Sequence, residues 1–174
     1  MLGLGQPLEG LRSTIDVSTI AAVISEVRIG DSRRGRDEIG PDIELIGDLR
    51  DQNAVNRSQA WNEVDAASDA FETVVQVPTE WDATLFLSGT TNALQANPDA
   101  NCMFLASDFA INSVQSALES AGRWAPVGDP NHMWMATQDL FPEALALMEQ
   151  GFVDVTTTYD AFEHAKEAVR VMTA

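Results

Sequence analysis

The sequence predicts an α/β fold built on a mostly parallel sheet. From residue 42 onward, short apolar runs alternate with segments whose apolar residues recur at helical spacing. One run, Cys102–Ala106, is continuously apolar, which is typical of a strand buried on both faces. Glycines and prolines fall where the helices should end, as at Pro98, Gly122 and Gly151. This alternation is the pattern of βα units, whose strands lie parallel.

Five strands and five helices are predicted in alternation. The strands are Ile43–Leu49, Glu72–Val77, Cys102–Ala106, His132–Ala136 and Phe152–Thr157. The helices are Val55–Phe71, Asp82–Asn97, a segment from Asp108 to Ala121, Pro142–Glu149 and a last one from Asp160. Asp82 is a predicted N-cap, because a short carboxylate can accept the hydrogen bonds of free amides at a helix start. Pro142 fits a first helical turn.

The last helix carries a capping-box pair, Asp160 and Glu163. Its apolar positions are Phe162, Ala165, Val169 and Met172, and we expect this face to be buried. Residues 1–40 differ from the rest, because Ser13–Asp16 and Ile20–Glu26 are only weak strand candidates. The sequence therefore divides into residues 1–40 and a clearer α/β unit at residues 41–174.

The composition excludes several partners. The net charge is −17, with 27 acidic and 10 basic residues, and Lys166 is the sole lysine. Such a surface repels nucleic acid and anionic lipid. Cys102 is the only cysteine, so an internal disulfide is impossible, and its apolar neighbours predict a buried side chain. The N-terminus lacks the pattern of a signal peptide, so the chain as given would stay in the cytoplasm.

No motif predicts catalysis. His132 and His164 have no second ligand at metal-binding spacing, so no metal site is expected. Gly3-Leu4-Gly5 lacks the rest of a phosphate-binding loop, and no G-x-S-x-G elbow is present. The carboxylates form no recognisable acid–base pair. We therefore expect a protein that is not an enzyme and needs no cofactor.

Aromatic or hydrogen-bonding residues follow four predicted strands. They are Trp81, Ser107, Asp139 and Tyr159. In open α/β sheets, ligands bind outside the carboxyl ends of the strands, so these residues could line a sugar site. Each has an alternative role: Trp81 could fold onto the core, Asp139 could cap the Pro142 helix, and Ser107 or Tyr159 could begin helices. Arg57 could donate to a hydroxyl or remain a solvated charge.

The chain from about Asp42 to Ala174 resembles the C-terminal lobe of periplasmic sugar-binding proteins of the ribose-binding type. It is also similar to the effector domains of lactose-repressor-type regulators, which share that fold. The segments that carry the resemblance are Asn53–Trp61 (compare R-x-x-G-F), Trp81–Asp99 (an aromatic-Asp pair and a terminal P-D), Phe104–Ala110 (F-A-x-N-D-x-M-A), Gln138–Glu143 (F-D-G-T-P-E) and Gln150–Tyr159 (x-G-x-x-x-A-T-V-A-Q). Their order and spacing over roughly 130 residues make the resemblance specific.

The resemblance implies a three-layer α-β-α lobe of the type I periplasmic-binding-protein fold. It places Trp81 where an aromatic ring stacks on the sugar, and Asp139 where a carboxylate accepts from sugar hydroxyls. Ser107 replaces the family's ligand-binding Asn, and Tyr159 replaces a Gln. Arg57 keeps the helix arginine, although Val55 occupies the position that the ribose-binding type uses most directly.

Leu11–Asp16 resembles the end of the family's first lobe, so Asp16 is a further expected ligand residue, with Val17 in place of the next Arg. Residues 1–40 then represent a remnant of the first lobe and the crossing segment. The implied function is the carbohydrate-binding lobe of an ABC-transporter substrate-binding protein, periplasmic in the family, with a sugar or polyol as ligand and a permease as partner. With one lobe only, we expect weak or absent binding.

Three alternatives remain open at this stage, and one of them is an enzyme on a flavodoxin-like fold, which a bound cofactor would reveal. The weak strands of Ser13–Glu26 would lack first-lobe partners, and an unpaired strand edge invites pairing with a second copy. The chain could therefore be a homo-oligomerising interaction module. It could also be a regulator's effector domain, which would need a helix-turn-helix region. The sequence does not identify the ligand or the oligomeric state.

Overall fold

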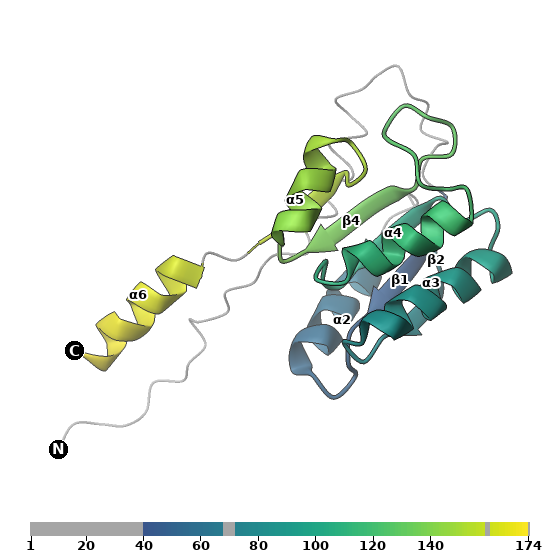
Figure 1. Ribbon diagram of the computed structural model, residues 1–174. Coiled ribbons are helices and arrows are strands. Elements are labelled where there is room, and N and C mark those ends of the chain that lie inside the picture. Colours follow the sequence, from purple (N-terminus) through teal and green to yellow (C-terminus); the bar gives the residue numbers. More distant parts are fainter. Residues whose placement is uncertain (1–39, 68–71, 159–160, 174) are drawn as a thin grey trace.

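The computed structural model describes residues 40–67, 72–158 and 161–173 (Figure 1). The predicted strands before residue 40, together with Asp16, Tyr159 and Asp160, lie outside these residues. The described strands are β1 (Pro41–Ile46), β2 (Glu72–Pro78), β3 (Cys102–Leu105), β4 (Trp134–Gln138) and β5 (Val155–Thr157). The described helices are α2 (Gln52–Ala66), α3 (Ala83–Ala96), α4 (Ile111–Ser120), α5 (Pro142–Glu149) and α6 (Ala161–Met172).

The strands form one parallel sheet in the order β2-β1-β3-β4-β5. The chain moves from β1 outward to β2, returns past β1 to β3, and then proceeds in one direction to β5. Right-handed crossovers consequently place α2 on one face of the sheet and α3, α4 and α5 on the other. The predicted three-layer α/β fold is confirmed.

Strand alternation divides the core into two clusters. On the α3–α4 face, Ile43 and Leu45 pack with Phe86, Ile111 and their neighbours in the larger cluster. On the α2 face, the Trp61 ring stacks on Phe104 with centroids 4.3 Å apart and an interplanar angle of 5°. Both faces are therefore covered where the strands end, and the loops at those ends rest on a packed core.

Several predicted boundaries are confirmed and others shift. Asp82 is the N-cap of α3 and accepts from the Thr84 amide at 2.7 Å. Gly122 has a φ of +67°, as a residue that ends a helix in the left-handed conformation should. By contrast, α4 begins at Ile111 and not at Asp108, and its N-cap Ala110 makes no side-chain cap hydrogen bond. Cys102 is buried, as predicted.

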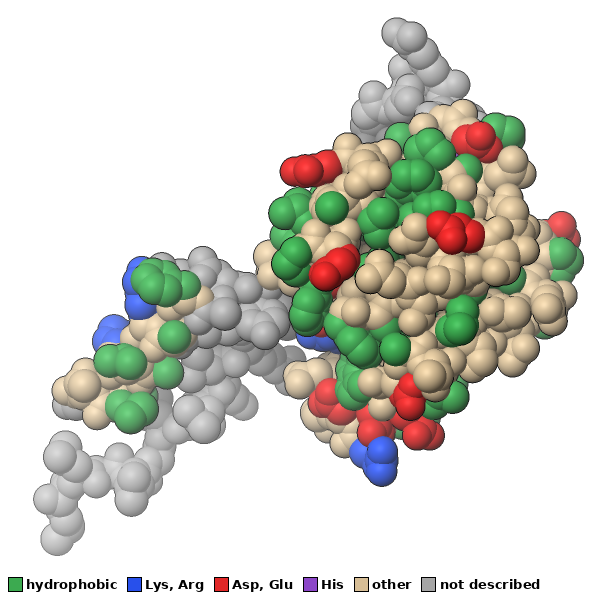
Figure 2. All heavy atoms as spheres, viewed as in Figure 1, with side chains coloured by type: hydrophobic (Ala, Val, Ile, Leu, Met, Phe, Trp, Pro, Cys, Tyr) green, Lys and Arg blue, Asp and Glu red, His purple; other side chains and the backbone are tan. Residues whose placement is uncertain are grey.

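The predicted buried face of the last helix is wrong. Phe162 is 69% exposed and Met172 is 84% exposed, and Ala165 and Val169 are exposed too. Figure 1 shows α6 lying apart from the sheet and the other helices, so these apolar residues are not packed against the core of the described chain. In Figure 2, α6 exposes green apolar side chains, and the body exposes green apolar patches together with scattered acidic groups. Among the described residues, no helix is long and apolar enough to cross a membrane.

Candidate functional site

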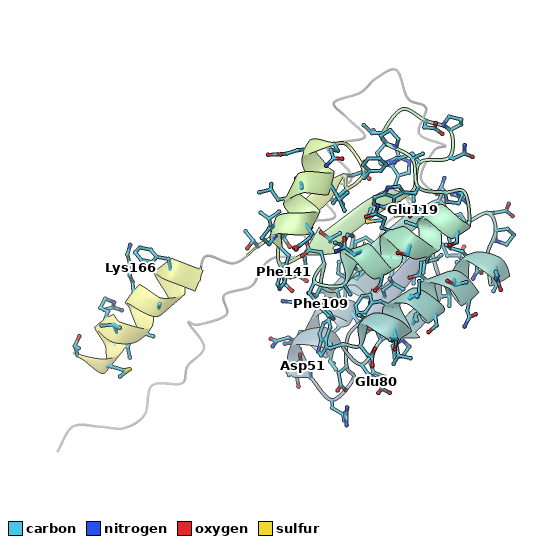
Figure 3. All side chains as sticks on the ribbon, viewed as in Figure 1. Asp51, Glu80, Phe109, Glu119, Phe141 and Lys166 are labelled. Atoms are coloured by element: carbon cyan, nitrogen blue, oxygen red, sulfur yellow. The ribbon has the colours of Figure 1, made fainter. Side chains whose placement is uncertain are left out.

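The loops after β1, β2, β3 and β4 meet at the carboxyl edge of the sheet. Because β1 pairs with both β2 and β3, and β3 with β4, parallel pairing brings these strand ends together. In Figure 3, the labelled residues Asp51, Glu80, Phe109 and Phe141 all lie at this edge. Ligand sites of open α/β sheets lie outside this edge.

Three predicted site residues meet here in one polar cluster. Arg57 projects from α2 and forms a bidentate ion pair with Asp139. Its Nη2 donates to Oδ1 at 2.9 Å and its Nη1 donates to Oδ2 at 3.2 Å. Ser107 Oγ, from the loop after β3, donates to Asp139 Oδ2 at 2.5 Å. Arg57 Nη1 also donates to the Ala106 carbonyl at 2.6 Å. We call Arg57, Ser107 and Asp139 the polar cluster.

The polar cluster retains hydrogen-bonding capacity of both kinds. The arginine and carboxylate side chains are 15% and 16% exposed, so solvent reaches both only at the edge. Within the described residues, Arg57 Nε and the second N–H of Nη2 make no hydrogen bond. Asp139 Oδ1 accepts one bond there and can accept another. Neighbouring donors and acceptors suit a hydroxyl group, which both gives and receives a hydrogen bond.

The alternative in which Asp139 caps the Pro142 helix is wrong. The N-cap of α5 is Phe141, which makes no side-chain cap hydrogen bond. Asp139 instead has a φ of +95°, followed by Leu140 at +58°, and its amide donates to the Thr157 carbonyl at 2.8 Å. This turn directs the Asp139 carboxylate toward Arg57 and Ser107. The alternative of a solvated Arg57 is also wrong, because its guanidinium pairs with the Asp139 carboxylate and is largely buried.

Trp81 lies at the same edge, at the end of β2. Its indole Nε1 donates to Asp51 Oδ2 at 3.0 Å, and the ring contacts both core clusters while remaining half-buried. A Cβ added to Gly47 would lie 2.0 Å from the ring, so one part of the indole rests directly on the backbone after β1. The Phe109 ring approaches edge-on with centroids 6.2 Å apart. Trp81 therefore packs on the core, which is one of its two predicted roles, and it lies at the carboxyl edge, where its predicted role in stacking on a sugar stays a prediction.

The backbone is strained in the two loops that carry these residues. The non-glycine residues with positive φ in the described chain are Glu80, Trp81, Asp139 and Leu140. They form two adjacent pairs, one after β2 and one after β4. Each such residue costs roughly 1–3 kcal/mol and tends to occur at functional sites. Asp139 is of a residue type that enters this region occasionally, whereas Glu80, Trp81 and Leu140 are not, so the local sequence favours these turns only weakly.

Sequence reasoning missed two aromatic residues at this edge. Phe109 is 40% exposed and Phe141 is 43% exposed, although both are large apolar side chains. Their positions in the sequence carry a signal, because Phe109 comes two residues after Ser107 and Phe141 two residues after Asp139. Together with Trp81 they give the edge an apolar surface beside the polar cluster. Exposed aromatic groups of this kind often mark contact with a ligand or partner.

Two further titratable groups, Asp42 and His132, lie off this edge. Asp42, fully buried on the α2 face of β1, accepts from Trp61 Nε1 at 2.9 Å and from Thr73 Oγ1 at 3.2 Å. Burial raises the pKa of Asp42 to about 7 against these hydrogen bonds, which lower it. His132 lies just before β4, at the opposite end of the sheet, and contacts Asp154 at 3.1 Å. Among the described residues, no group of three or more potential ligands could hold a metal ion.

The parallel sheet covered on both faces, with polar and aromatic side chains at its carboxyl edge, is the fold of a periplasmic binding protein domain. The chain belongs to the family described as periplasmic binding protein domain, whose model matches residues 28–174. Among curated proteins it is similar to the D-apiose import binding protein of Actinobacillus succinogenes, with 28% identity over 132 residues. That match covers 76% of this chain and 41% of the relative.

Solved structures show the same fold. The periplasmic ribose ABC transporter protein of Conexibacter woesei matches with a TM-score of 0.70 and 23% identity, covering 90% of this chain and 50% of that one. A periplasmic solute-binding protein of Actinobacillus succinogenes with bound D-allose matches with a TM-score of 0.63 and 23% identity, covering 79% and 44%. A solute-binding protein of Bacillus halodurans with bound myo-inositol gives 0.62 and 19%, covering 77% and 42%. The chain thus spans about half the length of these relatives or less.

Proposed function

We propose that this chain supplies one half of a carbohydrate-binding cleft in an ABC-type import system. The observation that carries the proposal is the polar cluster, because Arg57, Ser107 and Asp139 come from three separate elements and meet at the carboxyl edge. The relatives named above are described with D-apiose, D-allose, ribose and myo-inositol. A sugar or polyol is therefore the proposed ligand, and a membrane permease the proposed partner of the whole protein.

In this proposal each group has a defined task. Asp139 Oδ1 accepts a hydrogen bond from one ligand hydroxyl, and Arg57 donates to the same or a neighbouring hydroxyl. Ser107 Oγ, which donates to Asp139, accepts from another. Trp81 stacks on the C–H face of the ligand ring, and its indole is held in place by Asp51. Asp16 and Tyr159 are further proposed ligand residues by resemblance.

Charge supports a neutral ligand. Arg57 and Asp139 form a bidentate ion pair whose net charge is zero. The surrounding edge adds Asp48, Asp51 and Glu80, with Arg50 as the nearby basic residue, and Arg50 pairs with Asp48 at 2.7 Å. An anionic sugar acid or phosphate would therefore meet net repulsion, whereas a neutral polyol would not.

The test is ligand-observed NMR with the full 174-residue chain and a panel of ribose, allose and myo-inositol. We expect binding weaker than about 1 mM by this half-cleft. We expect this binding to be lost in Asp139→Asn, because the amide can no longer serve both as Arg57 partner and as hydroxyl acceptor. Asp129→Asn is the matched control, since Asp129 accepts backbone and side-chain bonds from Asn131 in a loop at the other end of the sheet. Absence of any signal from all three ligands at a sugar concentration of about 50 mM refutes sugar binding by this chain, because a site with a dissociation constant of tens of millimolar would then be partly occupied.

Light scattering on the same sample separates this function from self-association. A monomer that binds sugar supports a half-cleft. Sub-micromolar binding by a demonstrated monomer would contradict the expected weakness, because one lobe provides only part of the contacts.

A further inference from the structure

We infer that Asp108 is a positioning residue of the proposed sugar site: its buried carboxylate joins the loop after β3 to the turn after β4, and so fixes where Asp139 points. This inference rests on the proposed function and deepens it. Asp108 does not touch the polar cluster through any hydrogen bond in the described chain, and it does not cap α4.

Asp108 accepts four hydrogen bonds from the neighbouring strands and turn. Its Oδ2 accepts from Thr137 Oγ1 at 2.9 Å, from Thr156 Oγ1 at 3.3 Å and from the Leu140 amide at 3.1 Å. Its Oδ1 accepts from the Phe141 amide at 3.0 Å. The residue is 0% exposed, so these bonds replace the water that a carboxylate would otherwise hold.

Two of these hydrogen bonds are donated by backbone amides of the strained turn, those of Leu140 and Phe141. Leu140 has a φ of +58° and follows Asp139 at +95°, and neither is glycine. A left-handed pair of this kind persists only where its surroundings hold it. The Asp108 carboxylate supplies that hold, since amides bonded to a buried charged acceptor are among the strong hydrogen bonds. Release of Leu140 and Phe141 would let the turn relax and carry Asp139 away from Arg57.

The chain position of Asp108 couples both sides of the site. It lies between Ser107, which donates to Asp139, and Phe109, whose ring meets Trp81. Its own amide donates to the Gln138 carbonyl at 2.9 Å, directly before Asp139. A single residue thus links the backbone of the Ser107 loop with the backbone of the Asp139 turn. Two of the four partners of the carboxyl group are backbone amides, which can only donate, so each of its oxygens accepts a hydrogen bond. Burial raises the pKa of this carboxyl group above its usual value.

Two variants separate positioning from stability. Asp108→Asn turns an acceptor into an amide and releases at least one of the Leu140 and Phe141 amides. Thr137→Val removes one donor from the same carboxylate and leaves both amide bonds. Both variants should lower the midpoint of urea unfolding. If Asp108 only stabilised the fold, both variants would therefore weaken sugar binding to a similar extent. Asp129→Asn is the control for the Asp-to-Asn exchange.

The measurements are hydrogen exchange of the Leu140 and Phe141 amides by NMR and sugar affinity on the full chain. For Asp108→Asn we expect at least about tenfold loss of protection at one or both amides and at least about tenfold weaker sugar binding. Thr137→Val should keep both within about twofold. The inference is overturned if Asp108→Asn keeps full protection, if it loses protection and binds sugar as the native chain does, or if Thr137→Val loses as much affinity. If the native chain binds none of the sugars, the proposed function fails. The role of Asp108 in fixing the turn is then decided by hydrogen-exchange protection of the Leu140 and Phe141 amides and by the NMR signals of the Arg57 guanidinium, which report whether Arg57 still pairs with Asp139.

Discussion

Replacement of Gly47 by alanine should dislodge Trp81 and disable the proposed site. The added Cβ would lie 2.0 Å, 2.2 Å and 2.3 Å from three atoms of the indole ring. Ordinary contact begins near 3.4 Å, so the ring would have to retreat by 1.4 Å, the difference between 3.4 and 2.0. The ring is rigid and packs against both core clusters, so it has no easy path outward.

The expected cost follows from two contributions. Overpacking of this kind destabilises by about 1–3 kcal/mol. The shift also breaks the hydrogen bond from Trp81 Nε1 to the Asp51 carboxylate, which adds about 1–2 kcal/mol. Gly47→Ala should therefore lower the free energy of unfolding by about 2–5 kcal/mol in urea titrations followed by circular dichroism.

Gly122→Ala is the control, because a Cβ there meets nothing within 4 Å while the φ of +67° still disfavours alanine. Its cost should be about 1 kcal/mol. In the double variant Gly47→Ala/Trp81→Ala the clash disappears, so the two effects should fall short of additivity by about 1–3 kcal/mol. Equal costs for Gly47→Ala and Gly122→Ala, together with additivity in the double variant, would refute the reasoning.

Three further predictions concern charge and exposure. The pKa of Asp42 is raised from 3.8 to about 7, so its stabilising contribution is present below pH 4 and is lost as the pH rises through 7. Relative to Asp42→Asn, the native chain should lose about 4 kcal/mol of unfolding free energy between pH 4 and pH 8, about 1.4 kcal/mol for each of some three pH units, and a flat difference would contradict this. Arg57→Lys should weaken sugar binding at least about tenfold in NMR titrations while Arg123→Lys does not, since a lysine cannot span both Asp139 oxygens. Phe162→Ser should change the urea midpoint by less than the equivalent of about 0.5 kcal/mol because the side chain is exposed, and a loss above about 2 kcal/mol would show that α6 is packed.

The fold was predictable because its signals are local and repeated. Each buried strand is a short apolar run, and caps such as Asp82 and Gly122 follow from side-chain chemistry or from a missing Cβ. Strand ends drifted by a few residues, and β4 ends at Gln138 rather than at Ala136. The sequence predicts the last residue of a strand poorly, because the end of a strand depends on how far the neighbouring strand continues to pair with it.

The sequence could name the three residues of the polar cluster, but it could not predict the hydrogen bonds that join them. Ser107 and Asp139 could be named as residues after strands, but their mutual hydrogen bond depends on a left-handed turn with no glycine to indicate it. The same limit applies to Asp108, which sequence reasoning treated as a helix start. Its partners lie 29–48 residues away along the chain, where no local pattern reaches. The predicted burial of the apolar face of α6 was wrong for a related reason. An apolar face on a helix is buried only if another part of the protein packs against it, and the sequence of the helix does not say whether one does.

The residues of the polar cluster already make hydrogen bonds to one another, and this explains why we expect the proposed half-cleft to bind a sugar weakly. Asp139 already accepts three hydrogen bonds from the described chain, so a ligand gains only the groups that remain. Three such hydrogen bonds contribute about 1.5 kcal/mol each, and stacking on Trp81 adds about 1 kcal/mol. Loss of ligand translation and rotation opposes this by at least about 4 kcal/mol, so the net binding free energy stays well short of the 4 kcal/mol that corresponds to about 1 mM. A second set of contacts, from an opposing surface, would add to the favourable side without repeating the translational cost. In the proposed site, tight binding would therefore require enclosure by a second surface, and the polar cluster alone would only orient the ligand.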